Sequence, residues 1–344
     1  MKHGADIYLV TRVHGLRTHV IPARDLKILA KAKSLRDVFD SLMKTEYATE
    51  LSQLSSRDND AATLEGIFQK KLVDRFFFLS RTAQGKMQDL LIKYSARFEV
   101  ENIKRIVRAK HGGMTSEQLT LIPVPREHSL VNFAALVSAE DIDEVASLLR
   151  DTPYHVLLDK VESYKQSEST MVLEAALDSA YFSNVWELAG KVPDRKGVRD
   201  LVGEEIDLRN LLIAFSLKAR EIPQRVIEET LIPLFYAIPK DTIHSLLQAR
   251  LEDVPSVLTR RYSRLASEVA NLLKSQSTLP FEWPFFRQLY SDASEAMRAY
   301  PFQAGYVLAY LLLCECETKN LVTIVMGKQL DLGEEEISKG LYEV

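Results

Sequence analysis

Apolar residues recur along most of the chain at intervals of three and four, the spacing that places them on one face of an α-helix. No stretch alternates apolar and polar residues over many positions, and the dipeptides that favour hairpin turns are absent. With only 13 glycines and 12 prolines in 344 residues, the chain has few points at which helices must end. The pattern therefore predicts an all-α protein.

Helix boundaries are predicted where capping residues adjoin the apolar pattern. Ser34 and Ser138 each precede an apolar run and have an aspartate three residues later, as in a capping box. The pair Gly112-Gly113 is suited to end the helix before it. The expected helices cover a lead-in over 1–33, then 34–45, 64–79, 87–94, 99–110, 115–121, 138–152, 173–185, 198–218, a short helix before 231, a helix from 239, and 317–328.

The strongest signal is a twelve-residue segment that occurs three times. Each copy has an acid, an asparagine three residues later and a lysine eleven residues after the acid. The first and second asparagines are 108 residues apart, and the second and third are 110 apart. The copies are EVENIKRIVRAK with Glu99, Asn102 and Lys110; DLRNLLIAFSLK with Asp207, Asn210 and Lys218; and ETKNLVTIVMGK with Glu317, Asn320 and Lys328.

On a helix the three polar positions of each copy share a face with apolar residues. At 100° per residue, the asparagine lies at about −60° and the lysine at about +20° from the acid, close to the apolar positions that all copies share. A polar group on a buried face needs a hydrogen-bond partner or costs about 1–3 kcal/mol. We interpret the repeat as a structural network that ties each helix to its neighbours. The alternative, three copies of one catalytic site, lacks a nucleophile or metal ligand common to all copies.

Two further landmarks keep step with this repeat. Tyr47, Tyr154 and Tyr262 precede the three asparagines by 55, 56 and 58 residues. A threonine stands two residues before the first two tyrosines, whereas Arg260 takes that place in the third unit. The tripeptide Leu-Ile-Pro follows the first two repeat helices. The landmarks predict three homologous helical domains, over residues 1–130 with the lead-in helix, 131–237 and 238–344.

Composition excludes several classes of protein. The net charge is −4, so no overall positive field is present to attract nucleic acid. The longest uncharged apolar run, Ala304–Cys314, is too short for a membrane span, which needs about 20 residues. The N-terminal residues lack the apolar core of a signal peptide. Cys314 and Cys316 face apart on a helix and are not expected to pair, which fits a reducing compartment.

Known motifs for catalysis and cofactor binding are absent. The sequence contains no GxxxxGK[ST], GxGxxG or GxSxG segment. His14 and His19 are five residues apart, which is not the spacing of a metal-binding pair on a helix. The aromatic clusters at 76–78 and 285–286 are expected to belong to the core. We therefore expect no catalytic residue, metal ion, cofactor or direct small-molecule substrate.

The repeat helices, the tyrosine landmarks and the segment GYVLAYLLLCECETKNLVTIVMGK (Gly305–Lys328) resemble the central-stalk subunit of rotary ATPases. This family comprises the C subunit of A-type/V-type ATP synthases and the d subunit of eukaryotic vacuolar ATPases. Tyr8, Arg12 and Val13 are similar to the family's Tyr…Arg-Val start. His14 departs from the pattern, since a second arginine is more usual there, and so does Arg260; both departures touch single positions.

The resemblance implies a non-catalytic funnel of three helical domains around a pseudo-threefold axis. Such a protein is peripheral and sits on the cytoplasmic mouth of the membrane rotor ring of c/K subunits. Its cavity would receive the lower end of the central shaft, formed by the D subunit with the F subunit beside it, and it would couple ATP turnover to proton or sodium transport. By geometry, we expect the loops His111–Ser116 and Arg220–Gln224 to contact the ring or the shaft.

Two other interpretations remain open from the sequence. The first is a generic α-helical repeat scaffold or adaptor, although its units would be about 34–47 residues long rather than near 108. The second is a helical enzyme with an unrecognised site. A deep pocket with convergent ionisable groups of shifted pKa would favour that second interpretation.

Overall fold

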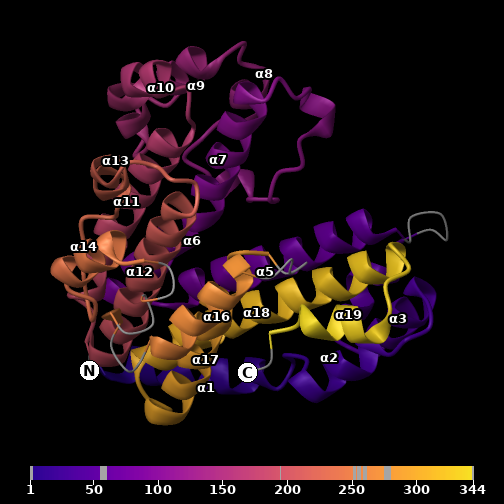
Figure 1. Cartoon of the computed structure of the whole chain (residues 1–344). Helices are drawn as coiled ribbons and strands as arrows, with labels where there is room; N and C mark the ends of the chain where they lie inside the picture. Colours follow the sequence, from indigo (N-terminus) through magenta and orange to yellow (C-terminus); the bar gives the residue numbers. More distant parts are fainter. Residues whose placement is uncertain are drawn as a thin grey trace.

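The structure is a computed structural model that describes residues 3–54, 60–193, 195–250, 253, 257–258, 262–274 and 280–342. Within these ranges every regular element is a helix, which confirms the all-α prediction (Figure 1). The α-helices are α1 (His3–Arg17), α2 (Ala23–Ala30), α3 (Leu35–Leu42), α4 (Ala48–Leu51), α5 (Ala61–Thr82), α6 (Gly85–Ser95), α7 (Arg97–His111), α8 (Phe133–Ser138), α9 (Ile142–Leu148), α10 (Val161–Ser167), α11 (Met171–Ala189), α12 (Arg195–Lys218), α13 (Gln224–Thr230), α14 (Lys240–Gln248), α16 (Ser263–Lys274), α17 (Trp283–Ala299), α18 (Ala304–Gln329) and α19 (Glu334–Lys339). Short 3-10 helices are η1 (Ser116–Gln118), η2 (Arg126–His128) and η3 (His155–Lys160).

The three copies of the repeat lie in α7, α12 and α18. Helices α12 and α18 are long, with 24 and 26 residues, whereas α7 has 15. In the first unit the equivalent stretch is divided at Ala96 between α6 and α7. From the middle of the molecule α7 and α18 run in different directions, as Figure 1 shows. The helices therefore come together in one part of their length and separate toward their C-terminal ends.

The beginning of the chain packs on its end. A compact apolar cluster joins residues from Ile21 to Phe68 with residues of α18 and α19, including Leu321, Ile324 and Ile337. Helix α5 lies along α18 in Figure 1. A second and larger cluster runs through the remaining helices. Fully burying one leucine or isoleucine stabilises a fold by about 1.5–3 kcal/mol, so the compact cluster holds the two ends of the chain together.

Each repeat helix ends in the same way. Gly113, Glu221 and Asp331, eleven residues after the asparagine of each copy, have positive φ values of 66°, 57° and 54°. The next amide in each case donates to the carbonyl five residues back, at 2.9, 3.1 and 2.9 Å. This is the arrangement of a Schellman C-cap, in which glycine is favoured because the left-handed conformation strains other residues. The expected glycine cap of the first repeat is confirmed.

Several predicted helix boundaries are wrong: the helix expected over 115–121 is only the short η1, and the repeat helix expected from 317 begins at Ala304. Two others have local reasons. The lead-in is two helices, α1 and α2, rather than one, because Pro22 has no amide hydrogen to continue a helix and instead stands at the N-cap of α2. In the second unit Ser138 is the last residue of α8, and Asp141 itself caps α9 by accepting from Glu144 N at 2.9 Å. At Ser34 the predicted cap is confirmed, because its hydroxyl accepts from Asp37 N.

None of the helices in the described ranges is both long and apolar enough to cross a membrane.

Candidate functional site

The acid of each repeat lies buried on its helix and accepts several hydrogen bonds. Glu99 Oε1 accepts from the hydroxyl of Ser129 at 2.7 Å and from Leu130 N at 2.8 Å. Its Oε2 accepts from the hydroxyl of Tyr154 at 2.5 Å. In the second repeat the shorter Asp207 accepts from three successive backbone amides, those of residues 236–238, at 2.6–3.0 Å. These two acids thus anchor the loops that follow their own repeat helices.

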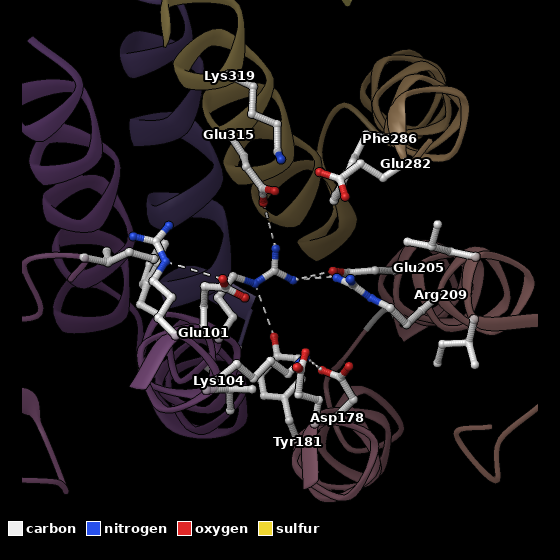
Figure 2. Close-up of a pocket in the computed structure, with 18 of the residues that line it drawn as sticks. Glu101, Lys104, Asp178, Tyr181, Glu205, Arg209, Glu282, Phe286, Glu315 and Lys319 are labelled. Carbon is white, nitrogen blue, oxygen red and sulfur yellow. Dashed lines mark hydrogen bonds and ion pairs between the residues drawn. The ribbon is translucent and has the colours of Figure 1, made fainter. Parts of the chain in front are cut away.

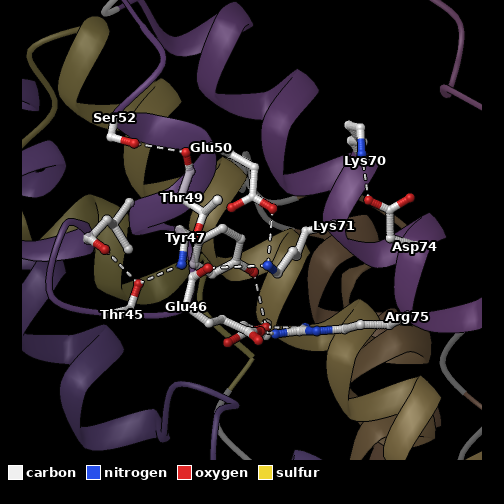
Figure 3. Close-up of polar contacts among 12 residues, drawn as sticks. Thr45, Glu46, Tyr47, Thr49, Glu50, Ser52, Lys70, Lys71, Asp74 and Arg75 are labelled. Carbon is white, nitrogen blue, oxygen red and sulfur yellow. Dashed lines mark hydrogen bonds and ion pairs between the residues drawn. The ribbon is translucent and has the colours of Figure 1, made fainter. Parts of the chain in front are cut away.

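The third acid receives its partners from the start of the chain. Glu317 accepts from Ile21 N at 2.7 Å, from the hydroxyl of Tyr47 at 3.1 Å and from the guanidinium of Arg75. Arg75 also pairs with Glu46, and Figure 3 shows this cluster beside Tyr47. For the third repeat, the first unit therefore takes the place that the second unit takes for Glu99.

The first two tyrosine landmarks have matching local contacts. The hydroxyl of Thr45 donates to Leu42 O at 2.6 Å and accepts from Tyr47 N at 3.3 Å. Thr152 makes the same pair of contacts, with Leu149 O at 2.7 Å and Tyr154 N at 3.1 Å. These turns aim each tyrosine at an acid. Arg260, which replaces the threonine in the third unit, lies outside the described residues.

Burial raises the pKa of Tyr154, and the adjacent Glu99 carboxylate raises it further. The pKa of Tyr47 is raised for the same reasons, burial first and Glu317 second. Both phenols therefore stay protonated and act as hydrogen-bond donors.

The asparagine of each repeat bonds both the N–H and the C=O of one backbone residue. Its amide nitrogen donates to the carbonyl of that residue and its amide oxygen accepts from the same residue's N–H. The partners are Ile122 at 2.9 and 2.7 Å, Ile232 at 3.0 and 2.8 Å, and Tyr342 at 3.0 and 2.7 Å. Asn210 donates in addition to Leu234 O at 3.0 Å. A carboxamide carries both groups, and asparagine presents them close to its own helix. The first two partners belong to the recurring Leu-Ile-Pro tripeptide.

The lysines are less uniform. Lys110 donates to Val137 O at 2.7 Å and to Ala139 O, and Lys218 donates to Leu247 O. The side chain of Lys328 makes neither a hydrogen bond nor an ion pair with any described residue. We call the side of each helix that carries the acid and the asparagine the tie face. On it the structure brings together the residues of each copy, not the three copies with one another.

The opposite side of each repeat helix meets the other two. Two residues before the acid stand Arg97, Glu205 and Glu315, about 160° around the helix from it. Arg97 donates to both oxygens of Glu205, at 2.7 and 2.9 Å, and to Glu315 at 2.9 Å. Positions that are equivalent in three repeats, 108 and 110 residues apart, thus form one ionic cluster. We call this side of the helices the pocket face.

A cavity of about 890 Å³ lies against this cluster. The repeat helices α7, α12 and α18 line it, together with parts of α5, α11 and α17 (Figure 2). Arg108 and Arg220 on its wall are exposed, so the cavity opens to solvent. Phe286, expected in the core, lines this cavity, whereas Phe76 and Phe285 are buried as predicted.

Ionisable groups converge in the cavity, but their pKa values are shifted away from neutral pH. The pKa of Tyr94 is raised mainly by burial, and Arg97 opposes that effect. Burial alone would lower the pKa of Arg97, but Glu205 and the nearby tyrosines raise it. A general acid or base needs a pKa near the working pH, and these groups move further from it. The arrangement is suited to holding charges in place rather than to proton transfer.

The described residues contain no cluster of histidines, cysteines and acids that could hold a metal ion. His14 stacks on Tyr306 and contacts Pro301 O at 2.7 Å. Both cysteines are buried, and burial raises the pKa of Cys314 to about 11. A thiol in that state is a weak nucleophile at neutral pH.

The sequence interpretation missed the Arg97 cluster. A signal was present, since the three residues stand at the same offset from the repeat acids. It went unnoticed because the residue types differ between copies: one arginine and two glutamates form a cluster only when the helices meet.

Comparisons with known proteins agree on one family. The family model of the ATP synthase (C/AC39) subunit matches residues 9–340. The chain is 24% identical to the C subunit of the A-type ATP synthase of Archaeoglobus fulgidus, over 96% of this chain and 94% of the relative. It is also 24% identical to the proteins of the same name from Methanocaldococcus jannaschii, over 96% and 84%, and Haloferax volcanii, over 97% and 96%.

Proposed function

The chain belongs to the ATP synthase (C/AC39) subunit family, and from this premise we propose that it is a non-catalytic coupler in the rotor of an A-type/V-type ATPase. In this role it joins the central shaft, made of the D and F subunits, to the membrane rotor ring. It transmits torque between ATP turnover and the movement of protons or sodium ions. It would lie at the cytoplasmic face of the membrane as a peripheral protein.

The observation that carries this proposal is the cavity at which the three repeat helices meet. A shaft needs a socket, and a cavity of about 890 Å³ that opens to solvent can receive the end of a helical segment. Three similar units around it support a funnel with pseudo-threefold symmetry, because Arg97, Glu205 and Glu315 meet from equivalent positions. The domain ranges 1–130, 131–237 and 238–344 belong to this proposal.

Torque transfer needs a stiff body, and the tie faces supply stiffness. Buried polar groups with every partner in place hold helices in one relative position. The contact of Glu317 with the start of the chain links the last unit to the first. An open helical-repeat scaffold leaves its two terminal repeats unpaired, so this link favours the coupler.

The loops after the repeat helices are candidate contact sites for the ring or the shaft. Residues 111–116 are all exposed, and the loop 220–224 begins at Arg220, which lines the cavity. Reversing the charges of Arg220 and Glu221, or adding charges in the loop 111–116, should weaken assembly with ring or shaft. Unchanged assembly would count against this part of the proposal.

Co-purification tests the whole proposal. The tagged chain would be isolated from solubilised membranes of its source and analysed for shaft subunits, ring subunits and ATPase activity. We expect both kinds of subunit and ATPase activity in the eluate. Recovery of the chain alone, under conditions in which the complex stays intact, would contradict the coupler role and favour a scaffold.

A further inference from the structure

The cavity has an asymmetric charge pattern on its pocket faces. Two residues after the acid of each repeat stand Glu101, Arg209 and Lys319, and all three line the cavity. At the neighbouring level, two residues before the acid, the signs are reversed: one cation, Arg97, lies between two glutamates. The ion pairs of Arg97 with Glu205 and Glu315 close that level, so it forms the base of the cavity.

Two residues after the repeat acid, Glu101 has ion-pair partners, whereas the side chains of Arg209 and Lys319 have none among the described residues. Glu101 accepts from Arg105 and lies 3.5 Å from Arg108. The side chains of Arg209 and Lys319 make no hydrogen bond or ion pair with the part of the chain that the structure describes. In Figure 2 both side chains point toward the middle of the cavity. The Nζ atom of Lys319 lies 3.8 Å from the ring centre of Phe286, and the guanidinium carbon of Arg209 lies 6.0 Å from it.

The buried acids of the cavity do not neutralise these two cations by direct contact. Asp178 pairs with Lys104 at 2.6 Å, and Glu205 and Glu315 both hold Arg97. Glu282 is exposed at the edge of the cavity and pairs with neither cation. Two half-buried positive groups therefore lie near the same aromatic ring.

The walls above this level differ from repeat to repeat. Five residues after the acid stand Lys104, Leu212 and Val322, and six residues after it stand Arg105, Ile213 and Thr323. The cations of the first wall are held by Asp178 and Glu101, whereas the other two walls present apolar residues one turn beyond Arg209 and Lys319. A partner with an acidic residue at its end and apolar residues one turn behind it matches the second and third walls.

We propose that the cavity is a keyed seat for the end of an amphipathic helical segment, whose acidic side chain binds between Arg209 and Lys319 while its apolar side packs on Leu212, Ile213 and Val322. This inference rests on the proposed function, since the segment is the end of the shaft. Because the third residue at the level of the two cations is Glu101, turning the segment by one third would place its acid beside another acid. The seat therefore sets the rotational position of the shaft relative to this protein.

Charge reversal tests the seat. The binding of purified shaft subcomplex, the D and F subunits of the same ATPase, to the full-length chain would be measured for wild type and for the double variant R209E/K319E. We expect a loss of at least about 100-fold, since two charge-assisted contacts are replaced by repulsion. The variant R209M/K319M should lose about 10-fold and bind with a weaker dependence on salt.

The matched control is R150E/K160E, which makes the same change of net charge at exposed positions outside the cavity lining. It should bind the shaft subcomplex within about twofold of wild type at about 0.15 M salt, where distant charges are screened. Circular dichroism and urea unfolding of each variant separate loss of binding from loss of folding. If wild type binds and R209E/K319E binds equally well, the seat is wrong and the coupler role stands. If wild type does not bind the shaft subcomplex, the coupler role itself fails.

Photo-crosslinking tests whether the shaft segment binds in a single orientation. A photoreactive residue would replace Lys104, Leu212 or Val322 in turn, in the assembled complex. A keyed seat predicts that each position captures a different side of the shaft helix. The same mixture of captured residues from all three positions would overturn the orientation part of the inference.

Discussion

The tie face and the pocket face of the same three helices differ in whether their residues recur from repeat to repeat. On the tie face the acid and the asparagine recur in every repeat, and the asparagines find equivalent partners in the backbone of Ile122, Ile232 and Tyr342. On the pocket face equivalent positions carry different residues, as in Arg97, Glu205 and Glu315.

This difference reflects what each face has to contact. The tie face of each helix binds a neighbouring backbone segment. Because this contact is needed in all three repeats, the same residues recur. The pocket face lies where the three copies meet, and three equal charges there would repel one another in a site of low dielectric. The three helices can therefore share one set of contacts on their tie faces while their pocket faces together line an asymmetric cavity.

The largest expected effect is on the tie face of the third repeat. Replacing Glu317 with Gln leaves Arg75 buried with only Glu46 as an acidic partner, and leaves one acceptor oxygen where two oxygens accepted from Ile21 N, Tyr47 and Arg75. Breaking a buried ion pair from one side costs about 3–5 kcal/mol. Urea unfolding would measure this loss, with Glu335→Gln on the exposed side of α19 as the control, expected within about 0.5 kcal/mol of wild type. A loss below about 1 kcal/mol would show that the tie face does not hold the two ends of the chain together.

The next effect concerns the cluster on the pocket face. Replacing Arg97 with Met leaves Glu205 and Glu315 without their common cation, and we expect a loss of about 3 kcal/mol in the free energy of unfolding. Arg209→Met, on the same face but without an ion pair, should change stability by less than about 0.5 kcal/mol. Equal losses in the two variants would mean that the equivalent positions do not act as one group.

A smaller effect should appear at the tyrosines that serve the tie face. Tyr154→Phe removes the hydrogen bond to Glu99, which should cost about 1.5–3 kcal/mol at neutral pH because the acceptor is charged. Tyr8→Phe, at an exposed position on α1, is the control and should unfold at the same urea concentration as wild type.

The same variant should change the dependence of stability on pH. The pKa of Tyr154 is raised in the folded state, so the unfolded chain loses its phenolic proton first. This contribution to stability is fully present below the unfolded pKa of about 10 and is lost as pH rises beyond it. Between about pH 10 and 11.5 the stability of wild type should therefore fall more steeply than that of Tyr154→Phe. Parallel curves would contradict the raised pKa.

The smallest effect concerns the helix ends, where the repeats differ in one residue. Gly113 occupies the left-handed position in the first repeat, whereas Glu221 and Asp331 are strained there. Glu221→Gly should stabilise the chain by about 0.5–1 kcal/mol, and Gly113→Ala should destabilise it by about 1 kcal/mol. Thermal unfolding would show opposite shifts in melting temperature. Shifts of the same sign would mean that the cap geometry does not govern these positions.

Features that depend on near neighbours could be predicted from the amino-acid sequence. The helical class, the repeat and its spacing follow from the period of apolar residues, and the cap at Ser34 needs only a side chain and an amide three residues away. Local reasoning was wrong where two signals competed within a few residues. Pro22 divides the lead-in helix, and Asp141 takes the capping role expected for Ser138.

Contacts between distant residues became visible only in the folded chain. Nothing local in the sequence joins Arg97 to Glu205 and Glu315, or Glu317 to Ile21 and Tyr47. Those contacts depend on how the helices pack, and packing is determined by the sum of many small apolar contacts across the whole chain. The unpaired side chains of Arg209 and Lys319 could not be predicted for the same reason. Whether a cation on a helix is paired depends on which acids the other helices place beside it.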